Sequence, residues 1–437
     1  MKKYIFRGSR LPWDNPTHFE YIMNNLPWDN IGNMLFPDSV IRAVMTDIET
    51  EVILIGAGNN YDVTKVDEIN NSFDAFVIPM ANAFREDMKL EPITKFVKLL
   101  KIPCVVTGVG FQGELEPDLH RQYSFDVMAK EFCIAVLDKS SSIGVRGEIT
   151  RDYLVKHLGL PAGKIDVIGC PSMQLLGGEL PENKKIISGE FKIATSMSMV
   201  NKNVIDFMVR ICNEFVNSEA IEQDINRIKL IYAGFCYGKN NSNKVNYNNE
   251  IYKTGRVVSF VNIPSWLAYM KRFNLHLGNR IHGAIASVLS GVPTAVICTC
   301  SRIRELAQYH SIPTIPIDIL TTDESAAKVI TRICDTVDFS SIYKVSRRNH
   351  EIFFNFLNRN GLDTIYSVSD YKRNTDSTLV PYDIKMSKIK FRAPLFPLSR
   401  LSCDEMQVRL DNYYGHLIQE IENKNKRIQL LKDQIQN

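Results

Sequence analysis

An arginine and a histidine two residues apart, Arg280 and His282, are the strongest candidates for chemistry in this chain of 437 residues. They follow a short apolar stretch that ends at Gly278, and an apolar run at helical spacing, 285–289, comes after them. A strand, a glycine and a helix in this order leave unpaired backbone N–H groups at the helix N-terminus, and these favour anions. Arg280 adds a forked cation that suits a carboxylate or a phosphate. Because His282 can carry a proton near neutral pH, the segment predicts an acidic ligand and proton transfer in one place.

Arg146 occupies an equivalent position earlier in the chain. It ends an apolar stretch, 142–146, and is followed by a glycine and a segment with helical spacing. If Arg146 and Arg280 both lie at the carboxyl ends of parallel strands, they face each other across a cleft, where one ligand with a carboxylate and a phosphate can bridge them. Taken alone, either arginine would more often be a surface residue or part of a structural salt bridge, and it is their paired placement that favours a functional role. A capping or core histidine is the corresponding alternative for His282.

Three further positions could contact an anionic ligand. Gly108 and Gly110 follow an apolar stretch, which is a weak signal for a phosphate-binding loop. Arg302 follows another apolar stretch at the start of a helical segment, so it could be a third cation at the site. The alternative for Arg302 is a solvated helix start next to Glu305.

A five-residue stretch that occurs twice precedes another candidate ligand-binding loop. The stretch Leu-Pro-Trp-Asp-Asn occurs at 11–15 and again at 26–30, and two copies do not make a repeat fold. The second copy leads into Gly32 and Asn33, where a glycine loop meets a helix start. This loop either cradles a ligand or is a plain turn.

The elements that must position these residues alternate between short apolar stretches and amphipathic segments. Strands are expected at 52–55, 75–79, 104–107, 142–146, 165–171, 192–195, 228–232, 257–261, 275–277 and 294–297. Strands separated by helices indicate parallel sheets with helices on both faces. The sequence therefore predicts an α/β fold with two doubly wound, Rossmann-like domains in series, 1–182 and 183–342, and a cleft between them.

The last part of the chain has a different pattern. Residues 343–400 are expected to form a docking helix around 351–357 followed by a polar, basic and proline-containing linker over 374–400. The segment 401–437 carries apolar residues at heptad spacing, with Lys424 at one core position. The heptad residues are Leu410, Tyr414, Leu417, Ile421, Lys424, Ile428, Leu431 and Ile435. This pattern favours a coiled coil and a homo-oligomer, while a single helix folded onto its own domain, or one lying on a membrane surface, stays open.

Composition excludes several classes of protein. A net charge of +3 without a strong basic block argues against nucleic acid as a partner. The nine cysteines are scattered and have no zinc-binding spacing, so we expect reduced thiols and no metal site. The basic start, 1–7, is not followed by a long apolar run, and no run approaches the roughly 20 residues of a membrane span. These features predict a cytoplasmic protein.

Missing motifs narrow the chemistry further. The sequence has no GxxxxGK[ST] loop, no GxGxxG in the required context, no Asp-x-Asp pair and no GxSxG elbow. Their absence favours chemistry on an anionic ligand without a metal or a cofactor.

Four motifs together resemble the polysaccharide pyruvyl transferase family. They are Ser-Ile-Gly-Val-Arg-Gly-Glu at 142–148, Val-Ile-Gly-Cys-Pro-Ser at 167–172, Arg-Ile-His-Gly-Ala at 280–284 with Gly-Val-Pro-Thr at 291–294, and Asn-Ile-Gly-Asn at 30–33. Each motif is moderately specific alone, and their order and spacing strengthen the match. The resemblance spans roughly residues 25–320 and leaves out the C-terminal hundred residues.

This resemblance implies a fold similar to the two-domain GT-B glycosyltransferases and transfer of a pyruvyl group from phosphoenolpyruvate onto a sugar as a ketal. On the matching positions, Arg146 and Arg280 would bind the donor and His282 would act as the acid/base catalyst. The expected substrate-binding residues are Gly32, Asn33, Gly108, Gly110, Gly283 and Arg302. Related enzymes tend to have a lysine at the position of Arg302, and an arginine keeps the charge there but cannot give up a proton.

The acceptor and two other functions stay open at this point. The acceptor is expected to be a glycan or a lipid-linked sugar, chosen by variable loops such as 238–249, and association with a membrane surface remains possible. A GT-B glycosyltransferase with a nucleotide-sugar donor would need an acidic or amide-bearing ribose site, which the sequence does not reveal. An inactive binding protein of the same fold would be favoured by loss of Arg146, Arg280 or His282, and all three are present.

Overall fold

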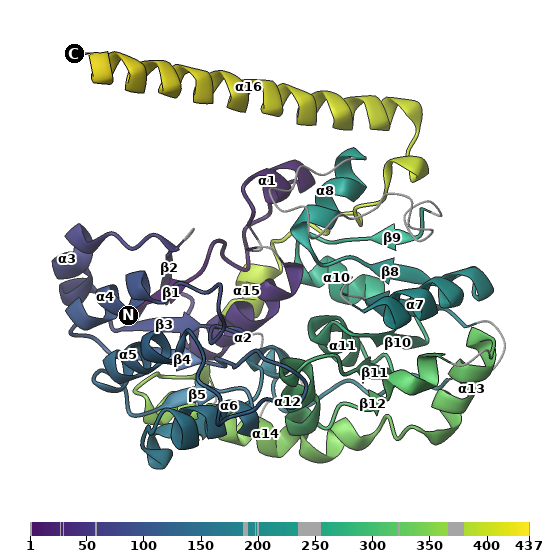
Figure 1. The fold of residues 1–437 in the computed structure, drawn as a ribbon, viewed down its shortest axis with the longest axis horizontal. Helices are drawn as coiled ribbons and strands as arrows, with labels where there is room; N and C mark the ends of the chain where they lie inside the picture. Colours follow the sequence, from purple (N-terminus) through teal and green to yellow (C-terminus); the bar gives the residue numbers. More distant parts are fainter. Residues whose placement is uncertain are drawn as a thin grey trace.

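The computed structural model describes residues 2–26, 28, 30–56, 59–186, 191–196, 198, 201–234, 255–321, 324–365 and 380–436. Two parallel sheets lie side by side within these residues, each flanked by helices (Figure 1). The α/β class predicted from the sequence is therefore confirmed. The loop 238–249, expected to influence acceptor choice, lies outside the described residues.

The N-terminal sheet contains four parallel strands in the order β2 (Glu51–Ile55), β1 (Lys3–Arg7), β3 (Ala75–Pro79) and β4 (Cys104–Thr107). A bridge between Val109 and Val145 joins it to the parallel pair β5 (Ile143–Val145) and β6 (Ile165–Val167). Its helices include α2 (Leu35–Val44), α3 (Val66–Ser72), α4 (Glu91–Leu99), α5 (Asp126–Leu137) and α6 (Glu148–Asp152). The sequence analysis missed β1, because its three buried apolar residues are flanked by basic ones.

The C-terminal sheet has the strand order β12-β11-β10-β7-β8-β9. Its strands are β7 (Ile193–Ser196), β8 (Glu219–Ile221), β9 (Val257–Val258), β10 (Leu275–Gly278), β11 (Thr294–Ile297) and β12 (Thr314–Ile315). Its helices include α7 (Lys202–Glu214), α8 (Ile225–Ala233), α10 (Ile263–Met270), α11 (Ile281–Val288), α12 (Ser301–His310) and α13 (Ala326–Thr336). Counted from β7, the order is 3-2-1-4-5-6, which is that of a doubly wound dinucleotide-binding sheet.

The strand predicted at 228–232 is wrong, because these residues belong to helix α8. Asp224 caps this helix by accepting the backbone N–H groups of Asn226 and Arg227, and Gly234 ends it with a φ of +78°. Apolar residues lie on all sides of α8, so their periodicity could not separate a buried helix from a buried strand. The strand predicted at 257–261 is shorter than expected and covers only β9.

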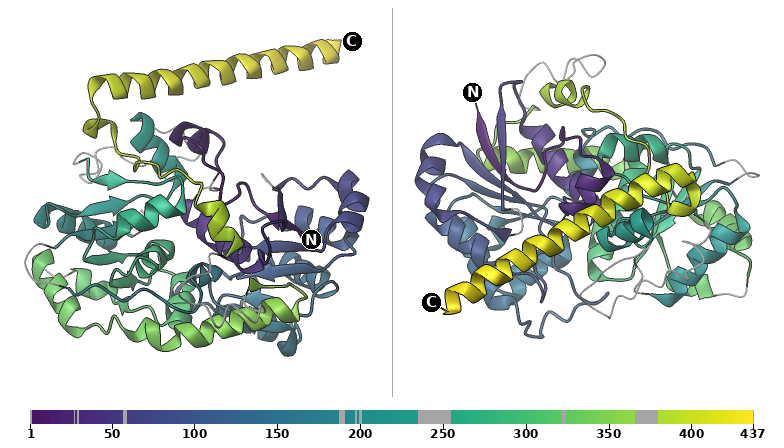
Figure 2. Two further views of the ribbon diagram at one scale, coloured as in Figure 1. Left: turned by 180° about the vertical axis from the view of Figure 1, so that it is seen from behind. Right: turned by 90° about the horizontal axis from the view of Figure 1, so that it is seen from above.

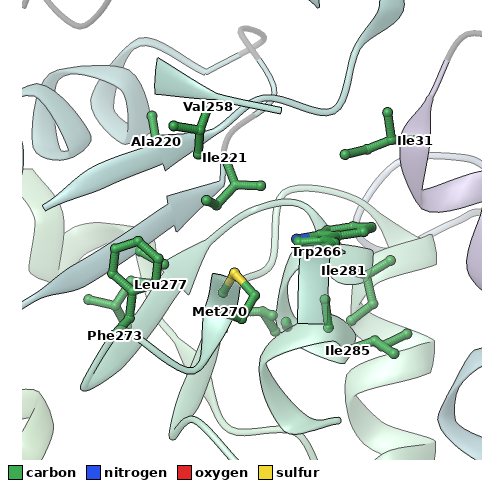
Figure 3. Packing of buried hydrophobic residues seen from close by; sticks show 14 of the residues in the cluster. Ile31, Ala220, Ile221, Val258, Trp266, Met270, Phe273, Leu277, Ile281 and Ile285 are labelled. Atoms are coloured by element: carbon green, nitrogen blue, oxygen red, sulfur yellow. The ribbon is translucent and has the colours of Figure 1, made fainter. Parts of the chain in front are cut away.

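The N-terminal segment crosses from one sheet to the other. Residues of α1 (His18–Met23) and of the 3₁₀ turn Ile31–Met34 pack into the hydrophobic core of the C-terminal sheet. Figure 3 shows Ile31 on the side of the core that holds Trp266 and Ile281. The backbone N–H of Ile31 also donates to the carbonyl of Gln223 at 2.9 Å. This crossing places the loop around Gly32 next to the C-terminal sheet.

The chain crosses back at its C-terminal end. Helix α14 (Ser341–Arg359) begins at the C-terminal core with Ile342 and ends on the N-terminal sheet with Phe353, Phe356 and Leu357. The linker predicted over 374–400 is described from residue 380 onward. That part forms helix α15 (Pro381–Met386) against α2, and Leu395 then pairs with Ser259 at the edge of β9.

Helix α16 (Cys403–Gln436) covers the predicted helical tail and extends away from the rest of the protein (Figures 1 and 2). Its first turns contact α8, where the ring of Tyr413 is buried near Tyr232. Beyond Leu417, the side chains that the structure describes are exposed, including Ile421 and Ile428. In the described part of the chain, no helix is both long and apolar enough to span a membrane.

Candidate functional site

A pocket of about 530 Å³ lies at the carboxyl ends of strands from both sheets. Arg7 at the end of β1 and Met80 after β3 contribute to its wall from one sheet, while Arg280 after β10 and Arg302 after β11 contribute from the other. Parallel α/β sheets bind ligands at these strand ends, because helix N-termini and loops converge there.

His282 lies on the pocket wall in the first turn of α11. Its side chain is buried, its Nε2 is 3.9 Å from Sγ of Cys170, and its ring centre is 6.1 Å from that of Phe36. Burial is the main reason that the pKa of His282 lies well below its usual value. Three guanidinium groups lower this pKa further, those of Arg146, Arg302 and Arg280. The imidazole is therefore neutral near pH 7 and can accept a proton.

Arg280 forms the N-cap of α11 and lines the same pocket. Its Nη2 lies 3.8 Å from Oδ2 of Asp224, the residue that caps α8. Burial and the nearby charge of Arg227 lower the pKa of Arg280 to about 10, so the side chain stays positively charged.

Arg146 is fully buried and does not lie on the pocket wall. Its Nε donates to the carbonyl of Gly108 at 2.8 Å, while its two terminal nitrogens have no hydrogen-bond partner. Burial lowers the pKa of Arg146, and the nearby Cys170 and Glu305 oppose that effect. A buried guanidinium with two unsatisfied nitrogens is costly for the protein, which points to an anion that completes its partners.

The prediction that Arg146 and Arg280 face each other across the cleft therefore needs a change. Arg280 is on the wall of the pocket, and Arg146 is buried outside that wall within electrostatic range of His282. Both arginines lower the pKa of His282.

Arg302 lines the pocket and donates from Nη1 to Oδ1 of Asn82 at 3.1 Å. Its Nε has no hydrogen-bond partner. Arg302 does not pair with the neighbouring Glu305. The carboxylate of Glu305 accepts the backbone N–H of Thr150 at 3.0 Å and the hydroxyl of Thr150 at 2.8 Å. Glu305 instead joins α12 of one sheet to α6 of the other.

The predicted glycines lie where a side chain would collide with neighbouring residues or where the backbone is left-handed. A β-carbon on Gly110 would lie 2.7 Å from Cδ of Arg146, and one on Gly32 would lie 2.6 Å from Cβ of His282. Gly108 has a φ of +73°, and a β-carbon on Gly283 would overlap with the side chain of Ser196. None of these four glycines is on the wall of the pocket, so their role in substrate binding stays a prediction.

Asn33 lines the pocket and donates from Nδ2 to the carbonyl of Trp28 at 2.7 Å. Its expected contact with substrate also stays a prediction, and the structure gives it a further role in fixing the loop that carries Trp28.

Sequence reasoning missed several residues of the wall. These are Arg7, Trp28, Asn59, Asn82, Arg85, Lys89, Gln223 and Asp224. Of these residues, only Trp28 belongs to a pattern noted in the sequence, the second copy of Leu-Pro-Trp-Asp-Asn at 26–30. The others follow strands β1, β2, β3 and β8, and no motif marks such loop positions. With Arg280 and Arg302, the pocket has five cations against the two carboxylates of Asp87 and Asp224, and so favours an anionic ligand.

Among the described residues, no three or more His, Cys, Asp or Glu side chains form a cluster suited to a metal ion. The eight cysteines in the described ranges are free thiols.

Comparison with known proteins gives a family match. The model of a family described as polysaccharide pyruvyl transferase matches residues 30–299. Curated protein sequences give no match.

Several solved structures resemble the fold at low identity. A Staphylococcus aureus MnaA–UDP co-structure is 11% identical with a TM-score of 0.43, covering 86% of this chain and 97% of that chain. The UDP-GlcNAc 2-epimerase of Methanocaldococcus jannaschii is 13% identical with a TM-score of 0.43, and the match covers 80% of this chain and 98% of that chain. The UDP-GlcNAc 2-epimerase of Neisseria meningitidis is 11% identical with a TM-score of 0.43, and the match covers 82% of this chain and 100% of that chain. At this level of similarity the likeness says nothing about the ligand of this chain.

Proposed function

Because the chain belongs to the polysaccharide pyruvyl transferase family, we propose that it transfers a pyruvyl group from phosphoenolpyruvate to a sugar and forms a cyclic ketal. The acceptor sugar belongs to a glycan or a lipid-linked precursor. One observation carries the proposal: the guanidinium groups of Arg146, Arg280 and Arg302 all act on the buried imidazole of His282.

The cations suit the charge of the donor. Phosphoenolpyruvate carries a carboxylate and a phosphate on adjacent carbon and oxygen atoms, so its negative charge is compact. Arg280 and Arg302 line the pocket and can each form paired hydrogen bonds with such groups. Arg146, which is buried outside the pocket wall, adds a positive charge close to His282. Guanidinium groups and helix N-termini supply this charge stabilisation without a metal ion or a cofactor.

The reaction needs two proton transfers. One sugar hydroxyl adds to C2 of the donor as its methylene carbon, C3, gains a proton and becomes a methyl group. A second hydroxyl of the same sugar then displaces phosphate from C2 and closes the ketal. One hydroxyl proton is thus retained on the methyl group, and the other leaves with the phosphate.

His282 is suited to move these protons. Its lowered pKa keeps the imidazole neutral in the free enzyme, so it can accept a proton from the attacking hydroxyl. Binding of the anionic donor offsets the positive charges that lower this pKa, so the ring is protonated more readily and can pass the proton on to C3 of the donor. General acid–base catalysis of this kind contributes about 10²- to 10⁴-fold.

The location of the enzyme, its self-association and its approach to a membrane are part of the same proposal. The enzyme works in the cytoplasm, self-associates through α16, and can approach a membrane surface when its acceptor is lipid-linked. The exposed apolar side chains of α16 support this view of the tail.

The test is release of phosphate from phosphoenolpyruvate that depends on an added glycan. His282→Gln should lower turnover by at least about 10²-fold without changing the unfolding temperature by more than a few degrees. His120→Gln is the matched control, since His120 is exposed and does not line the pocket.

Protection against thermal unfolding separates the two donor classes. Phosphoenolpyruvate should raise the unfolding temperature of the wild-type protein, and a UDP-sugar should not. Protection by the UDP-sugar alone would instead support a glycosyltransferase, and normal turnover in His282→Gln would remove the catalytic role of this residue.

A further inference from the structure

The pocket wall also carries neutral groups, an indole and several carboxamides, among them Asn25, Trp28, Asn33, Asn59 and Gln223. The proposed donor contacts use none of these side chains. Phosphoenolpyruvate has only about ten non-hydrogen atoms, whereas a pocket of about 530 Å³ is of the size that takes a larger ligand.

Trp28 is held in place from three directions. Its backbone N–H donates to the carbonyl of Asn25 at 3.0 Å, and its own carbonyl accepts Nδ2 of Asn33 at 2.7 Å. The guanidinium carbon of Arg7 lies 4.5 Å from the centre of the indole ring. The residue adopts a φ of +44°, which is unusual for a large side chain and is typical of positions that surrounding contacts fix for a purpose.

Two of these carboxamides have buried atoms without a partner. Oδ1 of Asn59 accepts no hydrogen bond, although Nδ2 of the same side chain donates to the carbonyl of Lys89 at 3.0 Å. Nε2 of Gln223 donates none, and the side chain of Gln223 is 1% exposed. The pocket therefore offers one free acceptor and one free donor, each on a neutral group.

We infer that Trp28, Asn59 and Gln223 form the acceptor subsite and that it takes a pyranose ring. The C–H face of a pyranose can pack on the indole, while its hydroxyls both donate and accept hydrogen bonds. One hydroxyl donates to Oδ1 of Asn59, and another accepts from Nε2 of Gln223.

The position of Trp28 connects the subsite to the reacting centre. Asn33, which holds the carbonyl of Trp28, directly follows Gly32, and Gly32 packs against His282. The 3₁₀ turn Ile31–Met34 thus fixes the sugar platform relative to the imidazole. The inference rests on the proposed transfer reaction and adds the residues that choose its acceptor.

The test uses three substitutions and two measurements. Trp28→Ala removes the platform, Trp28→Phe keeps an aromatic ring, and Gln223→Leu removes the unpaired donor at similar size. Phe391→Ala is the control, because it also removes an exposed aromatic ring but lies off the pocket wall. A panel of p-nitrophenyl hexopyranosides serves as the probe, followed by tryptophan fluorescence titration and by phosphate release from phosphoenolpyruvate.

We expect the wild-type fluorescence to change with at least one pyranoside. Trp28→Ala should raise the KM for that pyranoside by about tenfold or more, and Trp28→Phe should keep turnover but lose the fluorescence change. Gln223→Leu should also raise this KM. Thermal protection by phosphoenolpyruvate should persist in every variant, because Arg280 and Arg302 are unchanged.

A fluorescence signal that no pyranoside changes, or an acceptor KM in Trp28→Ala equal to that of Phe391→Ala, overturns the acceptor subsite alone. Failure of phosphoenolpyruvate to protect the wild-type protein overturns the transfer reaction instead. The two failures are therefore distinguishable.

Discussion

Gly32 packs directly against the imidazole of His282, although 250 residues separate them in the chain. A β-carbon at position 32 would lie 2.6 Å from Cβ of His282 and would overlap with its Nδ1. The backbone of the N-terminal segment thereby sets where the ring can lie. The turn that carries Gly32 is itself held against the C-terminal sheet by the hydrogen bond from Ile31 to Gln223.

Gly32→Ala should therefore displace the imidazole while the protein still folds. A misplacement of about 1 Å at a catalytic group can cost about 10²-fold in turnover, and we expect a loss of this size. The measurement is glycan-dependent phosphate release, with circular dichroism and the unfolding temperature as checks of the fold. Gly163→Ala is the control, because a β-carbon there meets nothing within 4 Å. Equal turnover in the two variants would show that this contact does not position His282.

The sequence predicted the strands of both sheets better than the segments that cross between them. Apolar stretches such as 75–79 and 104–107 are buried on both faces, and a continuous apolar run is the pattern of such strands. No periodicity reveals that residues of α1 pack into the core of the C-terminal sheet. That placement depends on tertiary contacts with partners far away in the sequence.

The residues of the candidate site differ in the same way: those next to strands were predicted, and those in loops were not. Arg280, His282 and Arg302 were found because each follows a strand at a helix start, and all three lie on the pocket wall. Arg146 was found by the same pattern but is buried outside the wall, since the pattern gives the end of the strand and not the direction of the side chain. Trp28 and Gln223 lie in loops, where residue type alone carries little structural information.

Arg146→Met should separate stability from donor binding. The guanidinium is buried with two unsatisfied nitrogens, so an apolar side chain of similar volume should leave the unfolding temperature of the free protein unchanged or raise it. Phosphoenolpyruvate should protect the variant less than it protects the wild-type protein. The wild-type protein should gain about 2.7 kcal/mol of stability at a donor concentration of 100 times Kd.

Differential scanning fluorimetry with and without the donor measures both effects. A variant that unfolds at a much lower temperature would assign Arg146 a structural role. Protection equal to that of the wild type would show that its free nitrogens do not serve the donor.

The pH dependence of kcat/KM should report the lowered pKa of His282. The neutral imidazole is the active form of the free enzyme, so activity is lost only when the pH falls through that pKa. We therefore expect kcat/KM to stay level across the usual titration range of histidine near pH 6.5 and to fall at lower pH.

Arg146→Met removes one of the charges that depress this pKa, so the acid limb of its profile should move to higher pH. Titration of the donor phosphate affects both proteins equally, and the difference between the profiles isolates the imidazole. Coincident acid limbs would mean that the group titrating in kcat/KM is not His282.

The exposed apolar face of α16 should hold two or more copies of the chain together. Ile421 and Ile428 are 58% and 50% exposed, and they occupy core positions of the predicted heptad series. Ile421→Asp together with Ile428→Asp should raise the dissociation constant of the oligomer by at least about tenfold, because charged residues in the seam lose their solvation. Light scattering coupled to size exclusion measures the mass, and Glu422→Asp is the control on the same helix. Turnover should be unchanged, since α16 contributes nothing to the pocket wall. A wild-type mass equal to that of one chain would instead favour a helix that remains unpaired or binds another surface.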